Sequence, residues 1–320
     1  MKNIEDIAKI AGVSKSTVSR YLNNGSVSNK TKQKLDKIIS ENNYQPNQFA
    51  QSLRARRTNM VGAIIPRMNS FAVDETIQGV KTICDNLNYR LLLNYTNLDI
   101  EKEIDALETF NRSKVDGIIF MATEITDRHL EVINKIDVPV IIVGQAHTDL
   151  NCVIHDDYRA GYLVGKYIGE KGFTCVQFFG VTESDEAVGI QRKEGLIDGL
   201  KVNGVMPQMT LTSFNFKEAM PDVKKTLNAS PNLEVVIGAT DSIALAVHKV
   251  ISEQSNQMFN PMVVGFGGDP VTEIVSPSIQ TVLYHFEEAG KVAMNQLEKL
   301  IQHVPAESKI LIDVSLSFKI

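Results

Sequence analysis

The sequence predicts two parts: an all-α head that contains a helix-turn-helix, and a two-lobed α/β body with doubly wound parallel sheets. Length is the first observation, because 320 residues suit about two domains. The second is the alternation of strand-like apolar runs with helical patterns from Met60 onward. The third is charge: residues 1–60 hold eleven Lys and Arg against four Asp and Glu, leaving the other 260 residues with 22 basic and 34 acidic side chains. A basic head indicates a polyanionic partner, although a solvated basic face without a partner is the alternative.

The head has the spacing of three short helices. Residues 4–11 place apolar side chains at helical intervals, and Gly12 breaks the pattern. A second helix is expected over about 15–23 with Ser14 as its cap, and a third begins after Ser28. Two helices joined by a short Gly-containing turn form a helix-turn-helix.

The second helix carries one polar face that suits the major groove of DNA. Arg20 can donate two hydrogen bonds to a guanine edge, and Lys15 can reach a guanine or a phosphate. Ser14 is expected to act more as a cap than as a base contact. The residues of the head predicted to contact DNA are Ser14, Lys15, Ser16, Thr17, Ser19, Arg20 and Asn23.

The segment AGVSKSTVSRYLN resembles the recognition segment of the lactose-repressor/galactose-repressor (LacI/GalR) family of bacterial transcription regulators. Residues 27–54 resemble that family's third helix and hinge, and the resemblance covers the whole chain. It implies that Lys15 and Ser16 choose the operator bases and that Arg20 contacts a guanine. The implied partner is double-stranded operator DNA, bound by a homodimer.

The hinge is predicted over residues 47–57, which combine a cap, apolar residues and three arginines. So short a helix is marginal in water, so we expect it to form on DNA, paired with its dimer mate over the minor groove. Leu53 is then the wedge that opens a base step, and a plain linker with a buried leucine is the alternative. The hinge residues predicted to lie against DNA are Asn47, Gln51, Leu53, Arg54 and Arg56. The predicted domains are 1–46 for DNA binding, 47–59 for hinge and linker, and 60–320 for sugar binding and dimerisation.

The sequence pattern of the body predicts two sets of parallel strands covered by helices. Strands are expected at 61–65, 90–95, 117–120 and 138–143 in one lobe, and at 175–179, 209–211, 235–239 and 262–265 in the other. Helices are expected at 74–87, 100–111, 158–171, 187–202, 217–228, 241–252 and 286–301. The resemblance implies a periplasmic-binding-protein-like body with a cleft between the lobes. Ligands of such sheets bind beyond the carboxyl ends of the strands.

Polar and aromatic residues follow several of these strands. Asn69 and Ser70 can bond sugar hydroxyls and Phe71 can stack on a sugar face, unless this is an ordinary surface loop. Arg192 matches the helix arginine that holds the effector in many relatives, with a salt bridge between the lobes as the alternative. Asp241 is expected mainly to cap the helix that it begins. The predicted effector-binding residues are Asn69, Ser70, Phe71, His155, Arg192, Thr240, Asp241 and Asp269.

The sequence departs from the family at positions near this cleft. Gly267 stands where relatives commonly have an Asp that takes sugar hydroxyls, and Asp269 follows two residues later. Gly144 likewise stands where some relatives have an acid, which suggests a pocket open to a larger or phosphorylated ligand. His155 is equally well explained as a structural histidine. Phe214 or Phe216 is expected to supply an aromatic wall.

Other classes of function lack their motifs. The sequence has no P-loop, no GxGxxG after a strand, no GxSxG and no HExxH, and its six histidines lie far apart, so we expect no catalytic residue, metal site or cofactor. Three widely spaced cysteines suit a reducing cytoplasm, and no apolar run is long enough to span a membrane.

The sequence thus predicts a cytoplasmic repressor of a sugar-utilisation operon, with sucrose as the expected sugar, released from its operator by a small sugar or sugar-phosphate effector. Ligand would close the cleft, move the first lobes and separate the hinges. The alternatives are a regulator of another carbohydrate operon, a corepressor-type carbohydrate regulator, a sugar-binding transport protein and a sugar-phosphate enzyme.

Overall fold

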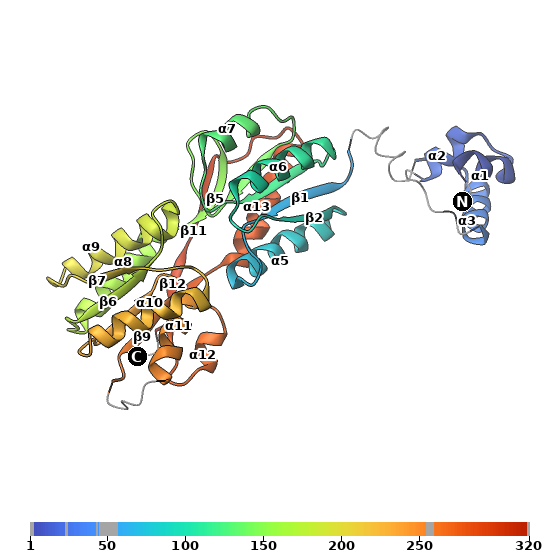
Figure 1. Cartoon of the computed structure of the whole chain (residues 1–320). Helices are drawn as coiled ribbons and strands as arrows, with labels where there is room; N and C mark the ends of the chain where they lie inside the picture. Colours follow the sequence, from blue (N-terminus) through green and yellow to red (C-terminus); the bar gives the residue numbers. More distant parts are fainter. Residues whose placement is uncertain (1–2, 23–24, 43, 45–56, 254–258, 319–320) are drawn as a thin grey trace. The chain divides into compact units, whose positions relative to one another are not determined.

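The computed structural model describes residues 3–22, 25–42, 44, 57–253 and 259–318. The chain divides into two compact units, Met1–Asn59 and Met60–Ile320 (Figure 1).

The head consists of α1 (Ile4–Ala11), α2 (Lys15–Leu22) and α3 (Asn29–Glu41). Asn3 caps α1, with the backbone N–H of Asp6 donating to its side chain and the Asp6 carboxylate accepting from the Asn3 N–H. Gly12 ends α1 in the left-handed conformation at φ 60°. The three helices meet on a small apolar core whose fully buried members are Ile7, Ala11, Val18 and Leu35.

The body contains two six-stranded sheets, one in each lobe. The first has the order β11-β5-β4-β3-β1-β2 and the second the order β12-β10-β9-β8-β6-β7. The first sheet comprises β1 (Met60–Ile65), β2 (Arg90–Tyr95), β3 (Gly117–Met121), β4 (Val140–Val143), β5 (Asn151–His155) and β11 (Lys309–Ile312). The second comprises β6 (Val176–Gly180), β7 (Gln208–Leu211), β8 (Val235–Gly238), β9 (Met262–Gly267), β10 (Gln280–Tyr284) and β12 (Val314–Leu316). The pairings are parallel except that of β10 with β12.

Helices cover both faces of each sheet (Figure 1). The first lobe has α5 (Phe71–Asn86), α6 (Ile100–Arg112), α7 (Asp127–Ile133) and α13 (Phe286–Ile301). The second has α8 (Asp157–Glu170), the π-helix η1 (Glu186–Gln191), α9 (Arg192–Lys201), α10 (Phe216–Ala229), α11 (Asp241–Ser252) and the short α12 (Val271–Ile274).

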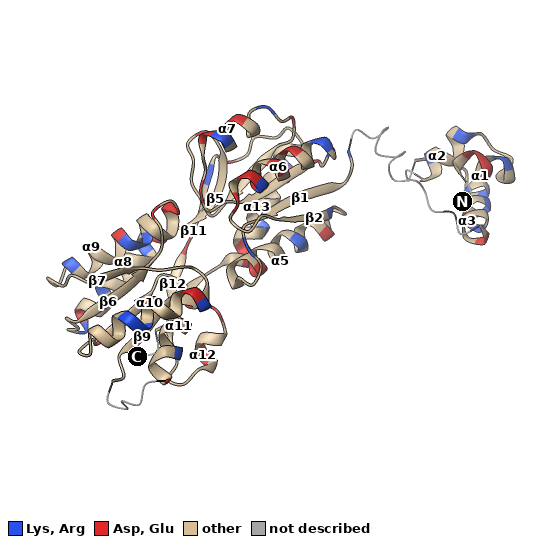
Figure 2. Ribbon diagram, viewed as in Figure 1, with Lys and Arg blue, Asp and Glu red and all other residues tan. Residues whose placement is uncertain are grey.

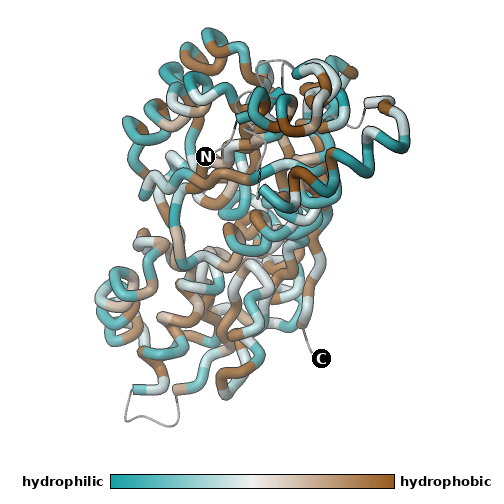
Figure 3. The backbone as a smooth tube through the Cα atoms, turned by 90° about the vertical axis from the view of Figure 1, so that its right-hand side faces the viewer, coloured by the Kyte–Doolittle hydropathy of each residue, from teal (hydrophilic) through white to brown (hydrophobic). Residues whose placement is uncertain are grey.

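Successive residues of a central strand pack against different helices. Ala63 of β1 packs in the cluster with α5 and α13, whereas the next residue, Ile64, packs in the cluster with α6. Both side chains are fully buried. The helices themselves alternate between hydrophilic and hydrophobic residues along their length (Figure 3). This double coverage explains why the central strands are continuous apolar runs.

The chain crosses between the lobes three times, which leaves each lobe built from separate stretches of sequence. The crossings follow β5, β10 and β11, at residues 155–157, 284–286 and 312–314. Helix α13 therefore covers the first sheet although most of the second lobe precedes it in the chain.

The predicted fold class is confirmed, and the differences are local. The helices expected at 241–252 and 286–301 have the predicted bounds, whereas the one expected at 187–202 is divided into η1 and α9. The elements α7, α12, β5, β10, β11 and β12 are not among the ranges expected from the sequence. No helix among the described residues is long and apolar enough to cross a membrane.

Close packing of α8 against α9 depends on glycine. A Cβ added to Gly195 would overlap the Tyr158 carbonyl oxygen, and one added to Gly161 would overlap that of Arg192. Both glycines are buried, and both opposing atoms belong to helix backbone that cannot turn aside. The two helices therefore lie closer together than side chains at these positions would allow.

We expect Gly195→Ala to destabilise the body, because α8 and α9 must separate to admit the methyl group. The loss should reach about 1–3 kcal/mol or more, as for other overpacked cores. Urea denaturation measures it, with Glu194→Ala as the matched control, since Glu194 is the exposed neighbour on the same helix. Equal stability of the two variants would contradict the close packing.

Candidate functional site

The outer face of α2 carries the polar side chains predicted to contact DNA. Lys15, Ser16 and Arg20 are exposed, while Val18 on the opposite face is fully buried. Thr17 and Ser19 are half-buried. Basic residues occur on all three helices of the head (Figure 2). The helix thus buries one apolar face and presents donors on the other, which is what entry into a major groove requires.

Ser14 and Lys15 both have partners within the head. The Thr17 backbone N–H donates to Ser14 Oγ at 3.2 Å, so Ser14 caps α2 as predicted. Lys15 Nζ lies 2.6 Å from Glu5 Oε1, and this hydrogen bond lowers the pKa of Glu5. Lys15 must give up Glu5 to reach a base or phosphate, and both side chains are exposed enough for this to cost little.

Six of the residues predicted to contact DNA lie outside the described residues, and their roles stay predictions. They are Asn23, Asn47, Gln51, Leu53, Arg54 and Arg56.

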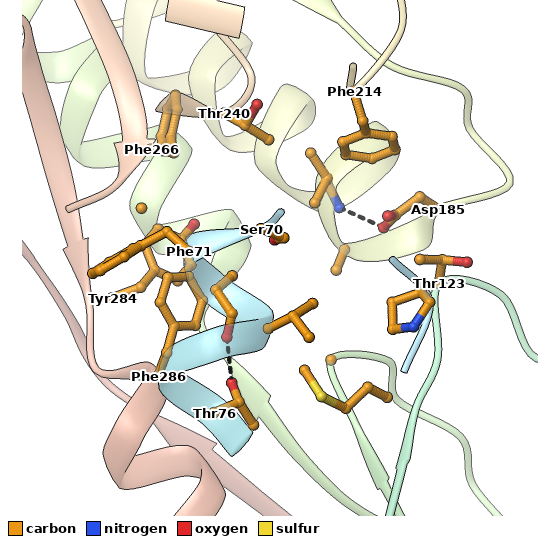
Figure 4. A pocket seen from close by; sticks show the side chains of 18 of the residues that line it. Ser70, Phe71, Thr76, Thr123, Asp185, Phe214, Thr240, Phe266, Tyr284 and Phe286 are labelled. Atoms are coloured by element: carbon orange, nitrogen blue, oxygen red, sulfur yellow. Dashed lines mark hydrogen bonds between the residues drawn. The ribbon is translucent and has the colours of Figure 1, made fainter. Parts of the chain in front are cut away.

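The body has a pocket of about 190 Å³ lined by both lobes, at the carboxyl ends of the parallel strands. All eight predicted effector-binding residues line it: Asn69, Ser70, Phe71, His155, Arg192, Thr240, Asp241 and Asp269. Figure 4 shows Phe71, Tyr284 and Phe286 on one side of the pocket and Phe214 and Asp185 on the other. Phe214, not Phe216, is the aromatic residue at this wall.

Arg192 forms a buried ion pair within the second lobe, not the expected alternative of a salt bridge between the lobes. Its Nε donates to Asp157 Oδ1 at 3.0 Å, and its Nη1 donates to the Ala239 carbonyl. The Tyr284 hydroxyl donates to the same Asp157 oxygen at 2.8 Å. The guanidinium also lies 4.9 Å from the ring centres of Phe266 and Tyr284. Both members of the pair are less than a tenth exposed, so Arg192 has a structural role whatever it binds.

The prediction that Asp241 caps α11 is wrong, because Thr240 is the cap. Thr240 Oγ1 accepts a hydrogen bond from the Ile243 N–H. The Asp241 carboxylate instead accepts from the Asp269 N–H at 2.8 Å and from Thr281 Oγ1 at 2.6 Å. Asp241 thereby holds the loop that follows β9 against strand β10. Burial raises the pKa of Asp241 to about 6, against these hydrogen bonds.

The same carboxylate explains the glycine at position 267. Gly267 has φ 147°, and a Cβ there would lie 2.8 Å from Asp241 Oδ2. An acidic side chain at this position would meet both a disfavoured backbone conformation and a like charge. Asp269 lines the pocket from the same loop, and its side chain also accepts from the Val271 N–H.

His155 lies at the first crossing in an aromatic cluster. Its ring centre is 5.1 Å from those of Tyr284 and Phe286. Burial lowers its pKa to about 4, so the ring is neutral at pH 7. His155 Nε2 is buried without a hydrogen-bond partner among the described residues. The neutral ring thus offers one uncommitted nitrogen at the pocket wall.

The two lobes also touch across the pocket through Gln145, Asp185 and Arg67, which are not among the residues predicted from the sequence. Gln145 Nε2 of the first lobe donates to Asp185 Oδ1 of the second at 2.9 Å, and the Ala187 N–H donates to Gln145 Oε1 at 3.3 Å. The Arg67 guanidinium lies 4.2 Å from the centre of the Phe214 ring. These residues follow strand ends in the sequence, as do the predicted ones, and that position was the available signal.

Known proteins match both units. A model of bacterial regulatory proteins of the lacI family matches residues 3–47, and a model of periplasmic binding proteins and the sugar binding domain of the LacI family matches residues 58–268. The chain belongs to the lacI family of bacterial regulatory proteins. Membership confirms the resemblance and sets aside the enzyme and transport-protein alternatives, because the helix-turn-helix unit is matched as well as the body.

Two curated relatives cover nearly the whole chain. A sucrose operon repressor of Staphylococcus xylosus is 71% identical over 319 residues, covering all of both chains. An HTH-type transcriptional regulator, RegA, of Clostridium saccharobutylicum is 30% identical and covers 93% of this chain and 92% of its own.

Solved structures share the fold. A lac repressor dimer bound to operator and the anti-inducer ONPF matches with a TM-score of 0.90 at 22% identity, covering 98% of this chain and 97% of its own. A complex of the regulator CelR with cellobiose matches with a TM-score of 0.74 at 20% identity, covering 99% of each chain.

We expect His155→Gln to lessen the loss of stability as the pH falls from 6.5 to 4. The folded pKa of about 4 lies below the ordinary 6.5, so the unfolded chain binds the proton first. The stability of the wild type is therefore complete above pH 6.5 and falls toward pH 4, by up to about 3 kcal/mol more than in the variant.

Urea denaturation across this pH range measures the difference. The exposed His303→Gln is the control and should leave the wild-type pH profile unchanged. Parallel profiles of wild type and His155→Gln would show that His155 does not carry the effect.

Proposed function

We propose that this protein is the repressor of a sucrose operon, which binds operator DNA through α2 and releases it when a sugar effector occupies the pocket of the body. The observation that carries the proposal is the 71% identity, over the full length of both chains, to the sucrose operon repressor of Staphylococcus xylosus. The cytoplasm is the location that such a function requires.

The surface of the head supports DNA binding. Arg20 and Lys15 stand exposed on the second helix of the helix-turn-helix, where bidentate and point-charge donors meet base edges and phosphates. Ser16 is exposed beside them. Within the proposal, Arg20 reads a guanine, Lys15 and Ser16 select neighbouring bases, and Ser14, Thr17 and Ser19 contact the backbone.

The proposal includes a homodimer, since a palindromic operator is read by two symmetric heads. Apolar side chains lie exposed on the edge strands of both sheets of the body: Leu93 of β2 is 54% exposed and Leu211 of β7 is 67% exposed. Tyr95 and Met209 accompany them on the same two strands. Exposed apolar edges of this kind mark interfaces, so we assign these edges to the partner subunit.

The proposed domains are 1–46 for DNA binding, 47–59 for the hinge and 60–320 for effector binding and dimerisation. In this proposal Leu53 wedges into the minor groove and Asn47, Gln51, Arg54 and Arg56 lie along the backbone. Effector binding couples to the hinge through the lobes, because a ligand held from both sides favours one arrangement of the three crossings over another.

We expect Arg20→Ala to weaken binding to the preferred operator by about 1–3 kcal/mol and to relax the choice of base at one position. The reason is the loss of two hydrogen bonds to a single guanine. A binding-site selection with the dimeric protein measures both effects. Lys37→Ala, an exposed lysine of α3, is the control. Equal weakening on every sequence would make Arg20 a phosphate contact instead.

We expect the double variant Leu93→Lys, Leu211→Lys to dissociate the dimer, because charges would replace apolar contacts on both edge strands. The dissociation constant should rise at least about tenfold. Sedimentation equilibrium measures it, and Val202→Lys, at an exposed apolar position beside α9, is the matched control. A double variant as dimeric as the control would place the interface elsewhere.

A further inference from the structure

An acidic side chain lies beside the residues of the head that are proposed to contact DNA. Glu5 is in the first turn of α1, and its Oε1 is 2.6 Å from Nζ of Lys15, the first residue of α2. Both side chains are about half exposed, Glu5 at 58% and Lys15 at 47%. Because a recognition helix meets base edges with its N-terminal residues, the Glu5 carboxylate lies within reach of the base pair that Lys15 contacts.

The structure of α1 fixes the backbone from which this carboxylate projects. The Glu5 N–H donates to Asn3 Oδ1 at 2.9 Å, within the cap of the helix. Two residues later, the Ile7 side chain is fully buried in the core of the head. A cap and a core contact on either side of Glu5 thus hold the start of α1 next to the start of α2.

The other three acidic residues of the head have different partners. The Asp6 carboxylate accepts from the Asn3 N–H at 2.9 Å and completes the cap of α1. Asp36 accepts from the hydroxyl group of Tyr21, which joins α3 to α2. Glu41 lies 3.8 Å from a lysine one turn earlier on α3. Glu5, in contrast, is paired with a side chain that is proposed to select a base.

DNA binding changes the surroundings of Glu5. The hydrogen bond from Lys15 lowers the pKa of Glu5, so the carboxylate is ionised at pH 7. When Lys15 turns to a base, the carboxylate loses this partner and faces a polyanion, which is unfavourable unless the groove supplies a donor. In the major groove a G·C pair presents both groups that are needed: guanine O6 and N7 accept from a lysine, and cytosine N4 donates to a carboxylate.

We propose that Glu5 is a specificity-determining residue of the head, which accepts a hydrogen bond from the cytosine of the base pair whose guanine Lys15 contacts. The inference rests on the proposed function, because it takes α2 as the recognition helix. If thymine or guanine replaced this cytosine, O4 or O6 would face the carboxylate, and two acceptors would repel one another. Glu5 would thereby add a choice of base to a lysine that by itself acts as a point charge.

Binding-site selection with the full-length protein tests the proposal. In each half-site we expect the wild type to prefer cytosine over thymine by about tenfold or more at the base paired with the Lys15 guanine. Glu5→Gln should reduce this preference to less than about threefold, because a glutamine amide can also donate to thymine O4. Glu41→Gln is the matched control, since Glu41 is also an exposed glutamate near a lysine, and it should leave every position unchanged.

A modified operator tests the same hydrogen bond without depending on a variant. Methylation of this cytosine at N4 replaces the N–H that faces the major groove and keeps the N–H that pairs with guanine. In gel-shift titrations the methyl group should weaken wild-type binding about tenfold, but that of Glu5→Ala less than about twofold. An operator that binds the wild type equally well with and without the methyl group would overturn the proposal.

The selection experiment also separates this inference from the proposed function. A wild type that selects no palindromic operator would contradict the repressor function itself. If the wild type selects one and Glu5→Gln keeps every base preference, the operator function stands and the role of Glu5 is overturned. Equal weakening by Glu5→Gln on all sequences would overturn it as well, because the pair with Lys15 would then act only on the structure of the head.

Discussion

The buried pair of Arg192 and Asp157 is the interaction on which the architecture of the body depends. Asp157 is the first residue after one crossing between the lobes, and Tyr284, which donates to it, is the last residue before another. Arg192 begins α9 and also donates to the carbonyl of Ala239, just after β8. One guanidinium therefore joins four segments that are far apart in the sequence. Removing one partner of such a pair leaves an uncompensated buried charge, which costs about 3–5 kcal/mol.

This arrangement explains why the pocket is polar yet has few groups left for a ligand. Asp241 holds the loop that follows β9 against strand β10, and Thr240 caps α11. Arg192 is bound to Asp157. Most polar side chains at the carboxyl ends of the parallel strands thus bind one another. A ligand is recognised by the polar atoms that have no partner in the protein. A residue that lines a pocket and a residue that recognises its ligand are different things, and hydrogen-bond partners distinguish them.

The head and the body are stabilised in different ways. The head buries only a few large apolar side chains and holds its short helices with caps, such as Asn3 and Ser14, so local interactions carry much of its stability. The body buries two sheets on both faces and brings α8 and α9 together at glycines. The two units also differ in charge: the head is basic, which suits a polyanionic partner, and the body is acidic.

The sequence by itself determined what short-range physics controls. Caps and helical spacing predicted the three helices of the head, and continuous apolar runs predicted the central strands, because these signals act over a few residues. The edge strands β11 and β12 were not predicted, since they are only four and three residues long and bury only part of their side chains. Thr240 and Asp241 are both good capping residues, and only the approach of Asp269 and Thr281 decided which one caps. The position of Arg67 after the first strand likewise gave no sign that its guanidinium would lie 4.2 Å from the centre of the Phe214 ring. Pairings between residues 28 or more positions apart are created by packing, so only the tertiary structure could decide them.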